Sequence, residues 1–386
     1  MTVNSDGSLF INIGGPQYQK TMSIMPMLVI AFLFSMWDVY VPQLELRVLD
    51  FVGVGLLCFW IFSKSTVDMR GPVFRTRNIH LLALMIAWSL VLSVVGVMES
   101  MENIKPIFGI LMGVAVFSYF YSIRLDDRSV AKVLSILIVI HASYLIIQYL
   151  YYQVFGIVPN IYEFLGTEPH ALSSIFRPTG LFLEPASYSV SILILLTLRI
   201  FIIKRFDAIT YIGVGTIFLT LSVWGLIAVV IVLLIFTKNN TKIFIIAAAL
   251  VMFIALPFTE GISAPDSPLS RLINLGEDSS AIARYGGLVG DVKNTLSFNN
   301  LWFGKGISNE YIEFGSSGMA FILSAGGLFG FCIFLLLLFL FAPSGRRIVT
   351  LVIILLLMTA APIWTTMYWW WFLALMMRPL ARVVQE

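Results

Sequence analysis

The amino-acid sequence predicts an all-α integral membrane protein with about twelve transmembrane helices and two large loops on the outer side of the membrane. Composition is the first reason. Hydrophobic residues make up 59% of the 386-residue chain and charged residues only 12%, and the mean hydropathy is +0.94. Apolar runs close to the ~20 residues that cross a bilayer then recur along the whole length. We therefore expect one polytopic membrane domain over residues 1–386.

The predicted spans follow one another with mostly short polar or basic connections. They are expected at residues 22–37, 48–62, 81–98, 106–123, 133–152 and 186–203, twice within 208–236, and at 243–257, 319–341, 349–363 and 367–377. The polar stretch up to Lys20 has no apolar core with a cleavage site, so no removable signal peptide is expected. Two connections are long, at residues 153–185 and 258–318, and each is predicted to be a large loop.

The apolar run at residues 208–236 is too long for one ordinary span and short for two. Basic pairs at 204–205 and 346–347 should both lie on the inner side, because cytoplasmic loops carry an excess of Lys and Arg. An even number of spans must then separate the two pairs. This requires two short helices between 208 and 236, with a turn near residues 222–225, which read Ser-Val-Trp-Gly.

Charge separates the two sides of the membrane in this arrangement. It places 17 of the 24 basic residues and 6 of the 21 acidic residues inside, a net +11, and leaves −8 outside, which together give the net charge of +3. By the positive-inside rule, both termini are expected in the cytoplasm and both large loops outside. In a bacterial inner membrane the large loops would face the periplasm.

Residues 176–187 form a segment broken by proline and glycine. Pro178 moves Arg177 out of the helical region, and a glycine and a second proline prevent a regular helix further on. Irregular backbone near membrane depth survives only where protein or a water-filled cavity satisfies its polar groups. We therefore expect Arg177 and Glu184 to line a site that opens to the outside.

Two residues of the first large loop are candidates for acid–base catalysis. Glu184 ends an apolar run beside a proline, and carboxylates in partly desolvated clefts can serve as general bases. The alternative for Glu184 is a salt bridge to Arg177 that only holds the loop. His170 lies in the same loop, and histidine titrates near neutral pH; its alternative is an exposed loop histidine.

Basic residues are scarce on the predicted outer side. They are Arg47, Lys105, Arg177, Arg271, Arg284, Lys293 and Lys305. A guanidinium binds phosphate oxygens in pairs, so Arg177, Arg284, Arg271 and Lys305 are candidate ligands of a substrate diphosphate. The alternative is that these cations pair with acidic residues of the same loops.

Three further features have simpler interpretations. His141 lies in the middle of a span, where bonding to a neighbouring helix is expected. Arg199 lies about one turn from the inner end of its span and is expected to extend its head group to the membrane surface. An aromatic cluster near the end of the chain suggests a belt at the outer membrane boundary, or a platform that stacks on sugar rings. Its members are Trp364, Tyr368, Trp369, Trp370 and Trp371.

Several familiar chemistries lack their motifs in this sequence. Cys58 and Cys332 both lie in apolar runs, and no cluster of Cys or His has metal-ligand spacing. There is no Walker loop, no dinucleotide fingerprint and no acidic pair of the kind that metal-dependent glycosyltransferases use. We expect no cofactor, no metal and no nucleic-acid partner. The energy for any reaction must then arrive in the substrate.

Short motifs occur in a fixed order over roughly the second half of the chain. They are Arg-Pro-Thr-Gly-Leu-Phe-Leu-Glu-Pro at 177–185, Leu-Thr-Leu-Ser at 219–222, Ser270-Arg271, Ala283-Arg284, Phe-Gly-Lys-Gly at 303–306 and Gly-Gly-Leu-Phe-Gly at 326–330. In order and spacing this set resembles the Wzy-type polysaccharide (O-antigen) polymerases and their relatives, the O-antigen ligases.

The resemblance implies a GT-C-like membrane glycosyltransferase of lipopolysaccharide biosynthesis, with its active site at the periplasmic face of the bacterial inner membrane. Its substrate would be an oligosaccharide repeat unit on undecaprenyl diphosphate. The growing chain would pass from one lipid diphosphate to the non-reducing end of another lipid-linked unit, without metal or nucleotide. Membrane lipid, a chain-length regulator and a flippase of the same pathway would be its partners.

Departures from the family pattern bear on the alternatives. Ligases of the family carry a histidine late in the second large loop, whereas this loop has none and reads Gly-Ser-Ser-Gly-Met at 315–319. This favours a polymerase over an O-antigen ligase. The arginine frequent after the Leu-Thr-Leu-Ser motif is also absent, with Val223 and Trp224 in its place. A flippase or transporter of lipid-linked oligosaccharide is the remaining alternative, disfavoured because no internal repeat is found.

Overall fold

A computed structural model describes residues 2–3, 9–10, 76–99, 104–122, 127–159, 176–182, 184–237, 298–307, 317–342, 346–359 and 367–377. This part of the chain is helical, apart from its connections and the paired two-residue strands β1 (Thr2–Val3) and β2 (Leu9–Phe10). The predicted all-α class is therefore confirmed for the part of the chain that is described.

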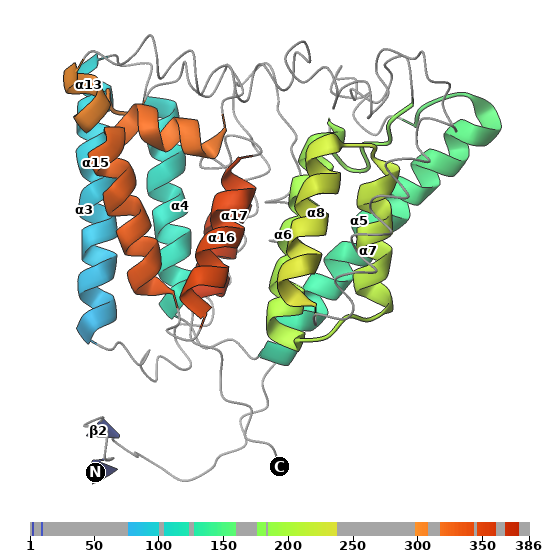
Figure 1. Cartoon of the computed structure of the whole chain (residues 1–386), viewed down its shortest axis with the longest axis horizontal. Helices are drawn as coiled ribbons and strands as arrows, with labels where there is room; N and C mark the ends of the chain where they lie inside the picture. Colours follow the sequence, from blue (N-terminus) through green and yellow to red (C-terminus); the bar gives the residue numbers. More distant parts are fainter. Residues whose placement is uncertain are drawn as a thin grey trace, which may run out of the picture.

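Ten helices lie in the described ranges. They are α3 (Thr76–Glu99), α4 (Ile104–Ser122), α5 (Asp127–Phe155), α6 (Pro185–Ile203), α7 (Ala208–Leu219), α8 (Val223–Phe236), α13 (Phe298–Phe303), α15 (Gly318–Phe341), α16 (Arg347–Met358) and α17 (Met367–Met377). They form two groups that stand beside each other in Figure 1. One group is α5 to α8, and the other contains α3, α4, α13, α15, α16 and α17. Contacts of α17 with α6 and of α16 with α8 join the groups.

Three of these helices are long and apolar enough to cross a membrane, namely α5, α6 and α15. Shorter apolar helices include α7, α8 and α16. These lengths and compositions indicate a membrane protein, while the total of twelve spans stays a prediction. The spans predicted at 22–37, 48–62 and 243–257 lie outside the described residues.

The predicted division of residues 208–236 into two helices is confirmed, because α7 ends at Leu219 and α8 begins at Val223. Leu221 between them has the left-handed φ of 51°, which no regular helix contains. Ser222 then caps α8, since its hydroxyl accepts a hydrogen bond from the Gly225 amide at 3.3 Å. The charge argument thus located the turn to within a few residues.

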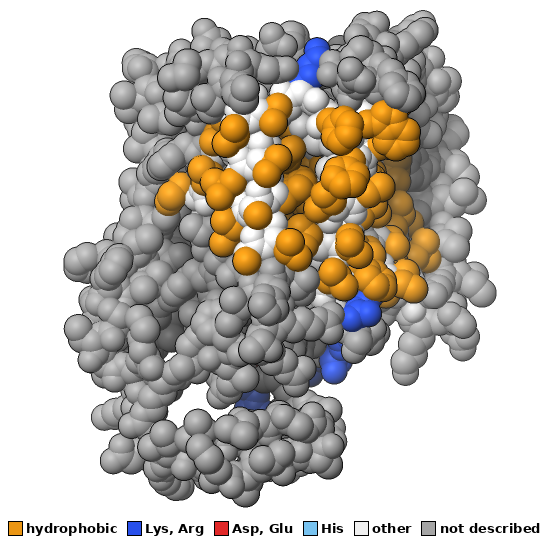
Figure 2. Space-filling model, turned by 90° about the vertical axis from the view of Figure 1, so that its left-hand side faces the viewer, with side chains coloured by type: hydrophobic (Ala, Val, Ile, Leu, Met, Phe, Trp, Pro, Cys, Tyr) orange, Lys and Arg blue, Asp and Glu red, His pale blue; other side chains and the backbone are white. Residues whose placement is uncertain are grey.

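The lateral surface of α3 and α15, which faces away from the other helices, is apolar (Figure 2). Large side chains on it are open to the surroundings, among them Leu90, Val91, Val94 and Phe329. Lys or Arg side chains lie above and below this apolar face in the same view. An exposed apolar band with cationic borders is the surface expected of a protein in contact with lipid.

The tryptophans of α17 are not an exposed aromatic belt. Trp369, Trp370 and Trp371 are all buried, at 0–1% exposure, because α17 packs between neighbouring helices and chiefly on α4. Gly113 of α4 makes room for the Trp370 indole: a Cβ on Gly113 would collide with that ring. The expectation of an interfacial belt is therefore wrong for these three rings, and they fill the core instead. Trp364 and the Tyr368 side chain lie outside the described residues.

Arg199 of α6 is buried at 3% exposure, so the expectation that it extends to the membrane surface is wrong. Its guanidinium donates to both carboxylate oxygens of Asp207, at 2.6 and 2.5 Å. It also donates to the hydroxyls of Ser135 in α5 and Thr210 in α7. The Arg199 guanidinium holds the pKa of the Asp207 carboxyl well below its ordinary 3.8. This one buried cation therefore ties three helices together.

Replacing Asp207 by alanine should lower the melting temperature of the detergent-solubilised protein sharply. The change leaves the buried Arg199 charge without its partner, and breaking such a pair costs about 3 kcal/mol. Arg205→Ala, an exposed cation in the same connection, is the matched control and should leave the melting temperature unchanged. Equal effects of the two variants would contradict a dominant role of the pair.

The same pair predicts an acid-sensitive fold. Because the folded pKa of Asp207 lies below the ordinary value, its carboxylate stabilises the folded state fully above about pH 4 and loses that contribution as the pH falls further. The melting temperature of wild type should therefore drop between pH 5 and pH 3 more than that of Asp207→Asn. Parallel pH profiles of the two proteins would show that another group controls the acid response.

Candidate functional site

The segment at residues 176–182 lies against the C-terminal end of α5. Phe176 stacks on Tyr152, with ring centroids 3.9 Å apart, and also contacts the ring of Tyr149. Proline and glycine in this segment exclude a helix, as the sequence predicts, and the described residues form a turn. The Phe182 amide closes that turn on the Thr179 carbonyl at 3.2 Å.

Gln148 of α5 holds the centre of this turn. Its Oε1 accepts hydrogen bonds from the backbone N–H groups of Thr179 and Gly180, both at 2.9 Å. Gln148 is 1% exposed, and Thr179 and Gly180 are buried as well. Buried backbone donors need a partner, and the side chain of a membrane-length helix supplies it for both.

Gly180 has the left-handed φ of +62°, and a Cβ there would lie 2.7 Å from the ring of Tyr188. The turn therefore requires glycine at this position twice over, through its backbone conformation and through the space beside it. After the turn, Phe182 packs between His141, at 5.3 Å between ring centroids, and Tyr188. The broken segment thus packs on side chains of both α5 and α6.

His141 lies in the interior, as predicted for a polar residue in the middle of a span, with 0% exposure. The predicted bond to a neighbouring helix is not found. Neither ring nitrogen has a hydrogen-bond partner among the described residues, and the ring stacks on Phe182 instead. His141 therefore supports the broken segment by packing.

The segment carries Arg177 half-buried and Glu184 exposed. Glu184 precedes α6 in an extended conformation, makes no capping hydrogen bond, and is followed by Pro185 in the first helical turn. The exposed carboxylate differs from the partly desolvated setting expected of a general base, because the helix begins just after it and leaves its side chain outside the packed core. No contact among the described residues shows either the base role or the ion pair with Arg177.

Three predicted site residues, His170, Arg271 and Arg284, lie outside the described residues. Lys305 is described, and it follows α13 in the Phe-Gly-Lys-Gly motif. The motif packs on the second glycine motif, at 326–330. Gly327 interrupts α15 with φ 61° and ψ −167°, which breaks the regular ladder of hydrogen bonds around the preceding turn. Two motifs distant in sequence thus meet in space.

Backbone hydrogen bonds fasten the first motif to the break in α15. The amides of Lys305 and Gly306 donate to the carbonyls of Ser324 and Ala325, both at 2.9 Å. The Ile307 amide then donates to the Leu92 carbonyl of α3 at 3.3 Å. The protein itself therefore satisfies the carbonyls beside the break, and Lys305 is placed by its own main chain.

Close backbone approach explains the glycines of both motifs. A Cβ on Gly306 would lie 2.3 Å from the Gly96 nitrogen, and a Cβ on Gly327 would lie 2.5 Å from the Trp302 carbonyl carbon. These neighbours are main-chain atoms that cannot rotate away. The glycines of both motifs are therefore required for close packing of the backbone.

Arg177, Glu184 and Lys305 belong to one side of the molecule. The end of α5, the start of α6, α13 and the start of α15 all lie toward the upper edge of Figure 1. In the sequence, Arg177 and Glu184 lie between α5 and α6, and Lys305 lies between α13 and α15. Lys305 nevertheless belongs to the other helix group. These predicted site residues therefore lie toward the same end of the molecule, with Lys305 in a different helix group from the Arg177 segment.

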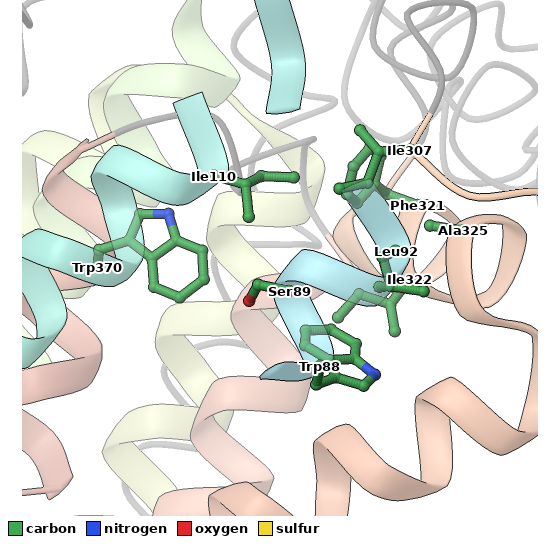
Figure 3. A pocket seen from close by; sticks show the side chains of 9 residues that line it. All are labelled: Trp88, Ser89, Leu92, Ile110, Ile307, Phe321, Ile322, Ala325 and Trp370. Carbon is green, nitrogen blue, oxygen red and sulfur yellow. The ribbon is translucent and has the colours of Figure 1, made fainter. Parts of the chain in front are cut away.

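A small cavity lies between α3, α4, α15 and α17 (Figure 3). Trp88, Ile110, Ile322 and Trp370 are among the nine residues that line it, and its lining surface is apolar. Its volume of about 10 Å³ matches a single water molecule. The cavity is therefore too small and too apolar to receive a sugar or a diphosphate.

Within the described ranges, no group of three His, Cys, Asp or Glu side chains is placed to bind a metal ion. Compared with known proteins, the sequence matches no family model and no curated protein. The candidate site therefore rests on the chain's own residues.

Sequence reasoning missed Gln148. A signal existed, because His141 and Gln148 are polar, lie seven residues apart in an apolar span, and so share one helix face. The partner of that face, however, is a turn more than thirty residues further along the chain. No periodicity within the helix indicates which backbone amides Gln148 meets.

Replacing Gly306 by alanine should reduce the yield of folded protein and lower its melting temperature. The new Cβ would meet the α3 backbone and force a left-handed residue without glycine, a combination that costs at least about 1 kcal/mol. Gly215→Ala is the matched control, because nothing lies within 4 Å of its new Cβ and alanine favours the helix. Normal yield and melting temperature for Gly306→Ala would contradict the clamped arrangement.

Proposed function

We propose that this protein is a polysaccharide (O-antigen) polymerase. It transfers a growing glycan from undecaprenyl diphosphate onto the non-reducing end of another lipid-linked repeat unit, at the periplasmic face of the bacterial inner membrane. One observation carries the proposal furthest: Arg177 sits on an irregular segment that is fastened, by buried contacts, to the end of a membrane-length helix. A cation held beside the end of a membrane-length helix is well suited to bind the diphosphate of a lipid-linked substrate.

The reaction asks little of the protein beyond charge and position. The acceptor hydroxyl oxygen attacks the anomeric carbon of the donor chain, and the bond from that carbon to the diphosphate oxygen breaks. Undecaprenyl diphosphate leaves with the bonding electrons, so negative charge develops on its oxygens. Arg177, Arg284, Arg271 and Lys305 would stabilise that charge. The energy comes from the glycosyl–diphosphate bond that breaks, because undecaprenyl diphosphate is a good leaving group, and no metal or nucleotide is needed.

The proton of the acceptor hydroxyl must also go to a base. Glu184 or His170 would accept it. Exposure of Glu184 keeps its carboxylate in contact with water, which lets the proton leave after each turnover. Glu184 is also the residue directly before α6, and a negative charge is favoured near the N-terminus of a helix.

Transport of a lipid-linked oligosaccharide is the competing function, because transporters use broken helices near the middle of the membrane. The break of α15 at Gly327 is such a feature. In transporters, however, the unwound carbonyls are free to coordinate the cargo or its ions. Here the carbonyls of Ser324 and Ala325 already accept hydrogen bonds from the backbone amides of Lys305 and Gly306. Carbonyls at the break that are hydrogen-bonded by the protein's own backbone favour the polymerase over a transporter.

The test is a reconstituted reaction in nanodiscs, with undecaprenyl-diphosphate-linked repeat units from the same cell, with chelator and without nucleotide. Wild type should produce a ladder of increasing glycan length on a gel. Arg177→Ala should form products about 100-fold more slowly, the scale on which removing one charge-stabilising group acts. Arg177→Lys should recover part of that loss, because a lysine keeps the charge but not the paired geometry.

Arg205→Ala is the matched control, since Arg205 is exposed in the connection between α6 and α7, predicted to lie on the inner side. Its product ladder should equal that of wild type. Intact substrate with wild type would refute the polymerase and move the proposal to transport or to a ligase that lacks its acceptor. A ladder of normal rate with Arg177→Ala would leave the polymerase standing and refute the role of that cation.

A further inference from the structure

We infer that Gln148 is the positioning residue that sets the conformation of the Arg177-bearing segment. This inference rests on the proposed function for its catalytic consequence. The geometric basis is the pair of 2.9 Å hydrogen bonds from Thr179 and Gly180 to the Gln148 side chain. Both partners are N–H donors, so the atom that faces them must be the amide oxygen and not the nitrogen.

The segment cannot satisfy these two amides by itself. Pro178 has no N–H group, and Gly180 has a left-handed backbone, so no helix or strand can continue through the turn. The hydrogen bond that closes the turn uses the Phe182 amide and the Thr179 carbonyl, which leaves the amides of Thr179 and Gly180 unpaired within the turn. Without the Gln148 oxygen, two buried donors would lose their partner, and leaving a buried donor unpaired is costly.

The link from this anchor to Arg177 is short and stiff. Only Pro178 separates Arg177 from Thr179, and the proline ring fixes one of the intervening backbone dihedrals near −65°. Holding the Thr179 amide in place therefore restricts the directions that the backbone can take at Arg177. Misplacing a charge-stabilising group by about 1 Å can cost on the order of 100-fold in rate.

Packing provides the competing explanation. Phe176 stacks on Tyr152 and Phe182 stacks on His141, so aromatic contacts alone could hold both ends of the turn. The two explanations differ in what the Gln148 oxygen contributes. Under packing alone, an apolar side chain of the same length would leave the turn and the reaction unchanged.

Three variants separate these explanations. Gln148→Met keeps the length and removes the acceptor, and Gln148→Glu keeps an acceptor oxygen in the same place. Gln153→Met makes the same chemical change at an exposed position of the same helix and is the matched control. If Gln148→Met is not recovered folded, Gln148→Asn is used instead, because asparagine is one methylene shorter and moves the acceptor away from the turn.

Each variant is measured in nanodiscs in two ways: amide hydrogen exchange of the peptide covering 176–182, and the rate of ladder formation over a range of substrate concentration. Gln148→Met should speed exchange at Thr179 and Gly180 at least tenfold. It should lower kcat at least tenfold and change KM by less than about twofold. Gln148→Glu should restore both readouts to near wild type, and Gln153→Met should match wild type.

The outcomes separate the inference from the function on which it rests. Unchanged exchange in Gln148→Met overturns the anchor, and faster exchange with normal kcat overturns its positioning role. Equal losses in Gln148→Met and Gln148→Glu also overturn it, because the acceptor oxygen would then not matter. A wild type that makes no ladder refutes the proposed function and the catalytic role with it, while the exchange data still decide whether Gln148 holds the turn.

Discussion

Backbone hydrogen bonding in apolar surroundings is the constraint on which this structure depends. Every peptide group that leaves a helix in such a setting needs a partner from the protein, because hydrocarbon offers none. The described chain leaves regular helix in two important places, the turn before α6 and the break in α15. A glutamine side chain satisfies the first, and the backbone of a neighbouring segment satisfies the second. The contacts of Gln148 are buried, and those at the break in α15 are partly buried.

Two of the predicted site residues lie beside these places. Arg177 adjoins the turn that Gln148 holds, and Lys305 is fastened to the break in α15 through its own amide. Irregular backbone, which is expensive to bury, is thus found next to two of the cations that we propose bind the diphosphate. Arg199 shows the opposite use of charge, because its four hydrogen bonds to Asp207, Ser135 and Thr210 leave it committed to holding helices together.

Elements that follow from local pattern or from charge parity could be predicted, and those that depend on distant partners could not. The break between α7 and α8 followed from the requirement that two basic pairs share one side of the membrane. The burial of Arg199 did not, because its partner Asp207 lies beyond the helix end and looked like an ordinary loop acid. The burial of Trp369 to Trp371 was missed since aromatic residues near a membrane boundary suit a belt and a core equally well in sequence. The candidate site was recognised as an irregular segment, but Gln148, which organises it, could be identified only from the fold.

The fastening of Lys305 and Gly306 to α15 also bears on how the chain is assembled. The segment at 303–307 precedes α15 in synthesis, yet its amides pair with carbonyls of α15 and with Leu92 of α3, far earlier in the chain. The bonds to Ser324 and Ala325 need only α15, whereas the bond from Ile307 to Leu92 requires α3 to lie beside this joint as well. The joint therefore combines two bonds that are near in sequence with one contact of large sequence separation, the kind that forms slowly in folding.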